Sequence, residues 1–235
     1  DPEVLVRSFQ QLGFEGHLLS DWQALTSHSH GIILVTGPTG SGKTTTLYSS
    51  LKQLATEQVN VCTIEDPIEM LEPSFNQMQV NTGIDLGFAD GVRALMRQDP
   101  DIIMVGEIRD HDTANMAIQA ALTGHLVLST LHTNDAPSSL TRLHDLGVQP
   151  FLTAATILGV LAQRLVRHLC PHCKVEKQIN SQEWEHLTFD YIMEMPEKVF
   201  TAVGCDECRQ TGYKGRVGIY AVSYTHLRAH ETDSY

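Results

Sequence analysis

The residues with the clearest chemical meaning form a glycine-rich stretch near the start of the chain. Residues 37–44 read GPTGSGKT and fit the pattern G-x-x-x-x-G-K-[ST] in full. Glycines let successive backbone N–H groups turn toward phosphate oxygens, and a helix that starts there adds the positive end of its dipole. Lys43 offers a charge to the β- and γ-phosphates, and the Thr44 hydroxyl is a ligand for Mg²⁺. The stretch predicts a nucleotide site made by Gly37, Pro38, Thr39, Gly40, Ser41, Gly42, Lys43, Thr44 and Thr45.

Carboxylates follow two apolar stretches further along the chain. Residues 101–107 read DIIMVGE, which predicts a strand that ends at Glu107, and ligands in open α/β sheets bind at the carboxyl ends of strands. We therefore expect Glu107 to order Mg²⁺ or water, although an acid at the start of a helix is the alternative interpretation. The cluster 65–69 (EDPIE) also follows a strand. Sequence alone leaves the choice among Glu65, Asp66 and Glu69 open, and a solvated acidic turn is a further interpretation.

Two histidines bracket the apolar stretch 126–130. A polar group at the end of a buried strand could contact the γ-phosphate, so His125 and His132 are candidate site residues. Hydrogen-bonded structural histidines are the alternative.

The cysteines suggest a second kind of site. Cys170-Pro-His-Cys173 and Cys205-Asp-Glu-Cys208 are two C-x-x-C pairs, and four thiolates close the tetrahedral coordination of a structural Zn²⁺. Such a metal would supply folding energy to a small lobe. A redox pair is the alternative, and we expect the fifth cysteine, Cys62, to be a small buried residue in a strand.

The elements that must position these residues alternate along the chain. We predict strands at 31–36, 59–64, 102–105 and 126–130. We predict helices at 44–56, 88–97, 110–123 with Asp112 as N-cap, 135–147 and 151–170. This α/β alternation is typical of a mostly parallel sheet that is covered on both faces.

Composition excludes several classes of protein. Hydrophobic residues make up 42% of the 235 residues and charged residues 19%, which excludes wholesale disorder. The sequence has neither an apolar run of roughly 18 residues nor a secretory signal. The net charge of −12 argues against a protein that mainly grips a phosphate backbone. Five cysteines without a secretory signal favour metal binding in a reducing cytoplasm.

Several motifs together resemble a known family. GPTGSGKTTTLY, TIEDPIE, RQDPDIIMVGEIRD, TGHLVLSTLHTND, LAQRLVRHLCPHC and TGYKGRVGIY follow the order seen in the secretion ATPases, the hexameric motors of type II secretion and type IV pilus assembly. The resemblance covers roughly residues 10–222. It implies a RecA-like P-loop core, with ATP bound between the subunits of a homo-hexameric ring. The four cysteines imply the zinc lobe of the assembly and secretion branch.

The resemblance also implies roles for individual residues. Glu69 matches the Asp-box acid proposed as general base, Glu107 matches the Walker B acid, and His125 and His132 match the His-box pair. Arg109 lies in the matching G-E-I-R-D stretch. The implied cofactors are ATP, Mg²⁺ and Zn²⁺. The implied partner is an inner-membrane platform protein at the cytoplasmic face, and no nucleic acid is expected.

We expect four segments along the chain. Residues 1–30 lead in from a domain that lies upstream, 31–169 form the RecA-like core, 170–222 form the zinc lobe and return to the core, and 223–235 form a tail unlike the family. The chain is then a truncated piece of an ATP-hydrolysing motor. A nucleic-acid translocase, which the acidic balance disfavours, and a non-catalytic nucleotide-binding module are the alternatives.

Overall fold

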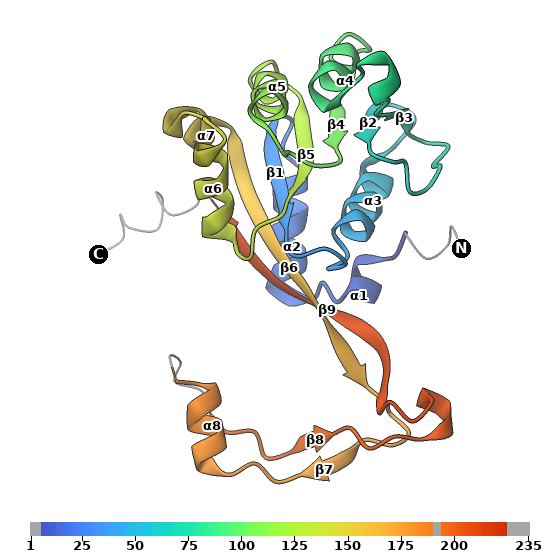
Figure 1. Cartoon of the computed structure of the whole chain (residues 1–235), viewed down its shortest axis with the longest axis vertical. Coiled ribbons are helices and arrows are strands. Elements are labelled where there is room, and N and C mark those ends of the chain that lie inside the picture. Colours follow the sequence, from blue (N-terminus) through green and yellow to red (C-terminus); the bar gives the residue numbers. More distant parts are fainter. Residues whose placement is uncertain (1–5, 190–193, 225–235) are drawn as a thin grey trace. The chain divides into compact units, whose positions relative to one another are not determined.

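The chain divides into two compact units. The computed structural model describes residues 6–189 and 194–224. The first unit comprises Asp1–Leu165 and Gly218–Tyr235, and the second comprises Val166–Val217. Two long strands, β6 (Ile157–Leu169) and β9 (Tyr213–Tyr224), each begin in one unit and end in the other (Figure 1).

The first unit is an α/β structure. Its other strands are β1 (Gly31–Thr36), β2 (Val61–Glu65), β3 (Asn76–Gln79), β4 (Ile102–Val105) and β5 (Leu126–Leu131). Its helices are α1 (Phe9–Leu12), α2 (Gly16–Thr26), α3 (Lys43–Leu54), α4 (Phe88–Leu95), α5 (His111–Leu122), α6 (Ala136–Asp145) and α7 (Pro150–Thr156), with a 3₁₀ turn at Thr82–Ile84. The strands predicted at 31–36 and 102–105 are confirmed.

One sheet of seven strands organises this unit, in the order β3-β2-β4-β5-β1-β6-β9 (Figure 1). The pairs β1–β5, β1–β6, β2–β3, β2–β4 and β4–β5 are all parallel. Parallel strands end at the same edge, so the segments that follow β1, β2, β4 and β5 gather at one edge of the sheet. The predicted mostly parallel sheet is confirmed.

Helices cover both faces of the sheet because inner strands such as β1 and β4 carry buried apolar side chains on both sides. On β1, Ile32 and Leu34 pack in one core with α4, α5 and α6. The alternate residues Ile33 and Val35 pack in a second core with α1, α2 and α3. Trp22 of α2 is fully buried there and donates its indole N–H to Ser50 Oγ at 2.9 Å.

The prediction of one helix over 151–170 is wrong. Helix α7 ends at Thr156, and β6 continues from Ile157 alongside β1. The apolar spacing of Leu158, Leu161, Ala162 and Leu165 suits a helix, but it equally suits a strand that is buried on both faces, and pairing with β1 decides the outcome. The N-cap of α5 is also corrected from Asp112 to Asp110, which has an extended backbone and accepts the Thr113 N–H at 2.8 Å.

The second unit has little apolar core of its own. Its elements are β7 (Val175–Lys177), β8 (Val199–Thr201), α8 (Ser181–Leu187) and a 3₁₀ turn at Asp206–Cys208, and β7 pairs antiparallel with β8. Helix α8 buries none of its residues. Among the described apolar and cysteine side chains of this unit, only Cys170 and Cys208 are buried. Nowhere in the described chain is a helix long and apolar enough to cross a bilayer.

Candidate nucleotide and metal sites

The glycine-rich loop connects the end of β1 to the start of α3. Gly37, Gly40 and Gly42 all have positive φ angles, which the turn requires and which other residues rarely adopt. At Gly37 a side chain is also excluded by space, because a Cβ would lie 2.2 Å from the backbone oxygen of Gln163. The loop therefore has the strand–glycine turn–helix setting that a phosphate site requires.

Lys43 is held inside the loop. The residue is 8% exposed, and its Nζ donates to the backbone oxygens of Gly37 at 2.9 Å and Pro38 at 3.2 Å. Burial lowers the pKa of Lys43, and the negative charge of Glu107 opposes that shift. An ammonium group bound only to carbonyl oxygens is ready to exchange them for phosphate oxygens. The buried Ser41 Oγ, which has no hydrogen-bond partner in the described structure, also fits a loop built for a ligand.

Gln163 is a contact of the loop that sequence reasoning missed. Its Nε2 donates to the Ser41 oxygen at 2.7 Å, and its Oε1 accepts from Thr46 Oγ1 at 2.8 Å. The amide lies on β6, within the segment wrongly predicted as helix. A polar residue directly after the apolar run 157–162 (ILGVLA) was the signal that could have found it.

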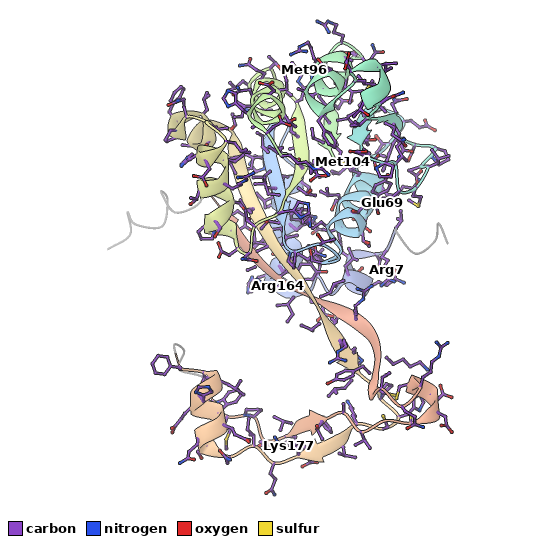
Figure 2. The ribbon with its side chains drawn as sticks, viewed as in Figure 1. Arg7, Glu69, Met96, Met104, Arg164 and Lys177 are labelled. Atoms are coloured by element: carbon purple, nitrogen blue, oxygen red, sulfur yellow. The ribbon has the colours of Figure 1, made fainter. Side chains whose placement is uncertain are left out.

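Glu69 lies close to the phosphate loop although the strand that precedes it, β2, does not neighbour β1. Strand β2 is not a neighbour of β1, since β4 and β5 lie between them. The segment 66–75 instead returns along α3, where Tyr48 donates to the Met70 oxygen at 3.1 Å. Glu69 thus lies beside α3 (Figure 2), and the Thr44 hydroxyl donates to Glu69 Oε1 at 3.4 Å. The Glu69 carboxylate therefore lies next to the hydroxyl that is predicted to be a ligand for Mg²⁺.

The surroundings of Glu65 differ from those of Glu69. Glu65 is 4% exposed and accepts hydrogen bonds from Tyr48, Thr63 and Gln77. Burial, together with Glu65, raises the pKa of Tyr48 well above its usual value. With its oxygens engaged in this way, Glu65 supports the turn, and Glu69 is the acid of the cluster that the fold brings to Thr44.

Glu107 follows β4 at the same edge of the sheet. It forms an ion pair with Arg109, and His132 Nε2 lies 3.4 Å from Glu107 Oε2. The hydrogen bond to Glu107 is the main cause that raises the pKa of Arg109. The Thr130 hydroxyl donates to the Gly106 oxygen at 2.7 Å and so ties the end of β4 to β5. The fold therefore gathers Glu107, Arg109 and His132 into one cluster.

His125 lies elsewhere. It precedes β5 at the amino edge of the sheet, whereas the phosphate loop follows the carboxyl end of β1. Its Nδ1 is 2.9 Å from the Ala120 oxygen and 3.2 Å from Thr123 Oγ1. With Asp101 and His28 it lines a cavity of about 460 Å³ at that edge. The structure of this chain does not bring His125 to the phosphate loop.

The four paired cysteines meet in the second unit. Their sulfur atoms all lie within 4.8 Å of one another. The Sγ–Sγ distances are 3.9 Å for Cys170–Cys205 and 3.8 Å for both Cys173–Cys208 and Cys205–Cys208. Zinc–sulfur bonds of about 2.3 Å give a tetrahedral edge of about 3.8 Å, so the cluster fits a tetrahedral thiolate site. Cys62, in contrast, is buried on β2.

Backbone N–H groups donate to the sulfur of Cys208 and stabilise its thiolate form. The N–H groups of Cys205 and Gly212 donate to Cys208 Sγ at 3.2 and 3.1 Å. Burial opposes ionisation of Cys208, but these N–H groups, together with hydrogen bonds from the thiols of Cys205 and Cys173, outweigh it and lower the pKa of Cys208 to about 6. Thiolate is the form that binds metal, so this donor pattern favours a metal site over an inert cluster.

The model of the type II/IV secretion system protein family matches residues 1–232. The chain belongs to this family. It is 84% identical over 220 residues to the type IV pilus assembly ATPase TfpB of Acinetobacter baylyi, covering 94% of this chain and 38% of that protein. It is 51% identical over 209 residues to the type II secretion system ATPase E of Vibrio cholerae, covering 89% of this chain and 41% of that protein.

Solved structures of the secretion ATPases support the same assignment of fold. The pilus retraction motor PilT with bound ADP is 38% identical, with a TM-score of 0.60 over 69% of this chain and 49% of that one. The RecA-like fold implied by the motifs is confirmed. The chain spans about two fifths of the length of its curated secretion-family relatives.

Proposed function

We propose that this chain is the ATP-hydrolysing core of a motor that powers type IV pilus assembly. One observation carries the proposal: the phosphate loop, the Thr44–Glu69 contact and the Glu107 cluster all belong to the carboxyl edge of one sheet. The 84% identity to a pilus assembly ATPase favours that machine over type II secretion, where the relative compared is 51% identical.

Each residue has a distinct task in this proposal. The loop amides and the Lys43 ammonium hold the terminal phosphates of ATP. Thr44 and Glu107 are the groups that would hold Mg²⁺, which neutralises negative charge on the phosphates when it is bound. Glu69 accepts a proton from the attacking water. Arg109 and His132 keep the Glu107 carboxylate oriented from two sides.

The proposed motor works as an assembly. Six copies form a ring that contacts an inner-membrane platform protein from the cytoplasmic side, and ATP binds between neighbouring subunits. A Zn²⁺ ion occupies the four-cysteine cluster, whose sulfur spacing supports it. The motor core is the first unit, which includes α1 and α2 of the segment 1–30, and residues 170–222 form the lobe with its return strand. Most of the proposed tail, 223–235, lies outside the described residues.

The test is phosphate release by the full-length protein in its assembled state. Lys43→Ala and Glu107→Gln should each lower turnover by roughly a hundredfold or more, because each removes charge that acts on the reacting phosphate. Asp101→Asn is the matched control, since Asp101 precedes the same strand at its opposite end and accepts the Asn60 N–H there. Turnover unchanged by Lys43→Ala would refute the proposed function.

A further inference from the structure

Gln163 joins three parts of the nucleotide site through one buried side chain. It is 2% exposed and lies on β6, which pairs with β1. Its amide nitrogen donates to the Ser41 oxygen and its amide oxygen accepts from the Thr46 hydroxyl. Its backbone oxygen occupies the space beside Gly37. A neighbouring strand thus contacts the start of the loop, its middle and the first turns of α3.

The bond to Ser41 fixes the direction of one peptide group. The carbonyl of Ser41 and the N–H of Gly42 belong to the same planar trans peptide, so they point in opposite directions. Because the carbonyl points to Gln163, the Gly42 N–H points away from Gln163. Gly42 is the N-cap residue of α3, where a free N–H is suited to an anion.

An amide is suited to this position for a chemical reason. The Ser41 oxygen requires a donor, and the Thr46 hydroxyl, as a donor, requires an acceptor. The side chains of Gln and Asn provide a donor and an acceptor in one neutral planar amide. A carboxylate keeps the acceptor for Thr46 but places an oxygen against the Ser41 oxygen. An aliphatic side chain satisfies neither group.

We propose that Gln163 is a positioning residue that holds the Ser41–Gly42 peptide with its N–H turned toward the phosphates. The inference rests on the proposed function, which assigns a nucleoside triphosphate to the loop. In this role Gln163 touches no nucleotide atom and acts through the loop alone. A loop that is already set in its binding conformation loses less entropy when phosphate binds, so Gln163 strengthens nucleotide binding.

Two single variants separate the two halves of the amide contact. Gln163→Glu removes the donor to Ser41 and keeps the acceptor for Thr46. Thr46→Val removes the Thr46 hydrogen bond and keeps the donor to Ser41. We expect Gln163→Glu to weaken binding of a non-hydrolysable ATP analogue roughly tenfold or more and to raise KM more than it lowers kcat. Thr46→Val should change the affinity much less.

The measurement is a titration of the full-length protein with a fluorescent ATP analogue and Mg²⁺, together with the thermal midpoint of each variant. Trp22→Phe is the stability control, because it removes a buried hydrogen bond on α2, away from the loop. Gln163→Asn serves if Gln163→Glu does not fold, since the shorter amide cannot reach both partners.

The outcomes separate this inference from the proposed function. Weak binding by Gln163→Glu, with Trp22→Phe binding like the wild type at a similar thermal midpoint, supports the positioning role. Wild-type affinity in Gln163→Glu, or a loss that merely follows the thermal midpoint as in Trp22→Phe, overturns it. If the unaltered protein does not bind the analogue, or Lys43→Ala binds it equally well, the proposed function itself fails.

Discussion

Glu65 and Glu69 come from one acidic turn, yet the fold gives them different surroundings. The oxygens of Glu65 accept from Tyr48, Thr63 and Gln77 in the core, whereas Glu69 meets Thr44 beside α3. A general base needs a free lone pair that can take a proton from water. Glu69 has the geometry for that role, and Glu65 has the geometry of a structural acceptor.

We expect Glu69→Gln to lower the rate of ATP hydrolysis by roughly a hundredfold or more while the affinity for ATP stays close to that of the unaltered protein. The amide keeps the size of the side chain and its contact to Thr44 but cannot accept the proton of water. Single-turnover kinetics measures the rate of hydrolysis, and equilibrium binding on the same preparation measures the affinity for ATP.

Glu65→Gln is the matched control for that experiment. It should lower the free energy of unfolding, by about 1–3 kcal/mol, because buried donors lose a charged acceptor. Denaturant unfolding measures this loss. If Glu65→Gln stops hydrolysis in folded protein and Glu69→Gln does not, the assignment of the two acids is reversed.

The sequence predicted the parts of the site that are contiguous in the chain, but not the contacts between residues that are far apart in the chain. The phosphate loop is contiguous, so residue type and order predict it. Gln163 contacts Ser41 and Thr46 across separations of 122 and 117 residues, and no local pattern reports such a contact. The choice of Glu69 came from the family resemblance, because the hydrogen bonds that engage Glu65 exist only in the folded chain.

At the scale of elements, β6 shows where apolar patterns are ambiguous. Strands β1 and β4 are short apolar runs, and their bounds were predicted correctly. The segment from Ile157 is longer and apolar at helical spacing, but its backbone pairs with β1, and its buried residues face both cores. A strand that is buried on both faces does not alternate between apolar and polar residues. Its pairing with a neighbouring strand is then what distinguishes it from a buried helix.

The segment that carries Glu69 is itself held by a carboxylate whose pKa gives a pH prediction. Burial alone would raise the pKa of Glu72, but hydrogen bonds from Lys52 and Ser74 outweigh it and hold the pKa below 4.5. The stabilisation is therefore fully present above about pH 4.5 and is lost as the pH falls through the folded-state pKa.

Urea unfolding of the unaltered protein and of Glu72→Gln tests this prediction. The variant should be less stable near neutral pH, and the difference between the two proteins should shrink as the pH falls below about 4.5. A difference that stays constant across this range would show that ionisation of Glu72 does not stabilise the segment.

For the whole molecule, the two units rely on different forces. The first has two apolar cores, one on each face of its sheet. In the second, the buried apolar and cysteine side chains of the described residues are Cys170 and Cys208. We expect a strong chelator to abolish hydrogen-exchange protection in Val166–Val217 and to leave that of β1, β4 and β5 unchanged, because the proposed Zn²⁺ would replace the missing core.

Cysteine variants provide the control for metal removal. Cys205→Ser should lower the zinc content measured by elemental analysis and produce the same local loss of protection. Cys62→Ser should retain the metal, since Cys62 is buried on β2 in the sheet. Zinc content that is unchanged in Cys205→Ser would remove the four-thiolate site.

The pairing of β6 with β9 has a consequence for the newly made chain. The ribosome releases β6 first, and its edge partner β9 follows only after residues 170–212 have been synthesised. During that interval the outer edge of β6 is an open template for strands of other nascent chains. We therefore expect slow translation of the second unit, or slow binding of its proposed metal, to cause aggregation of newly made chains. Chains that complete folding would keep their catalytic activity.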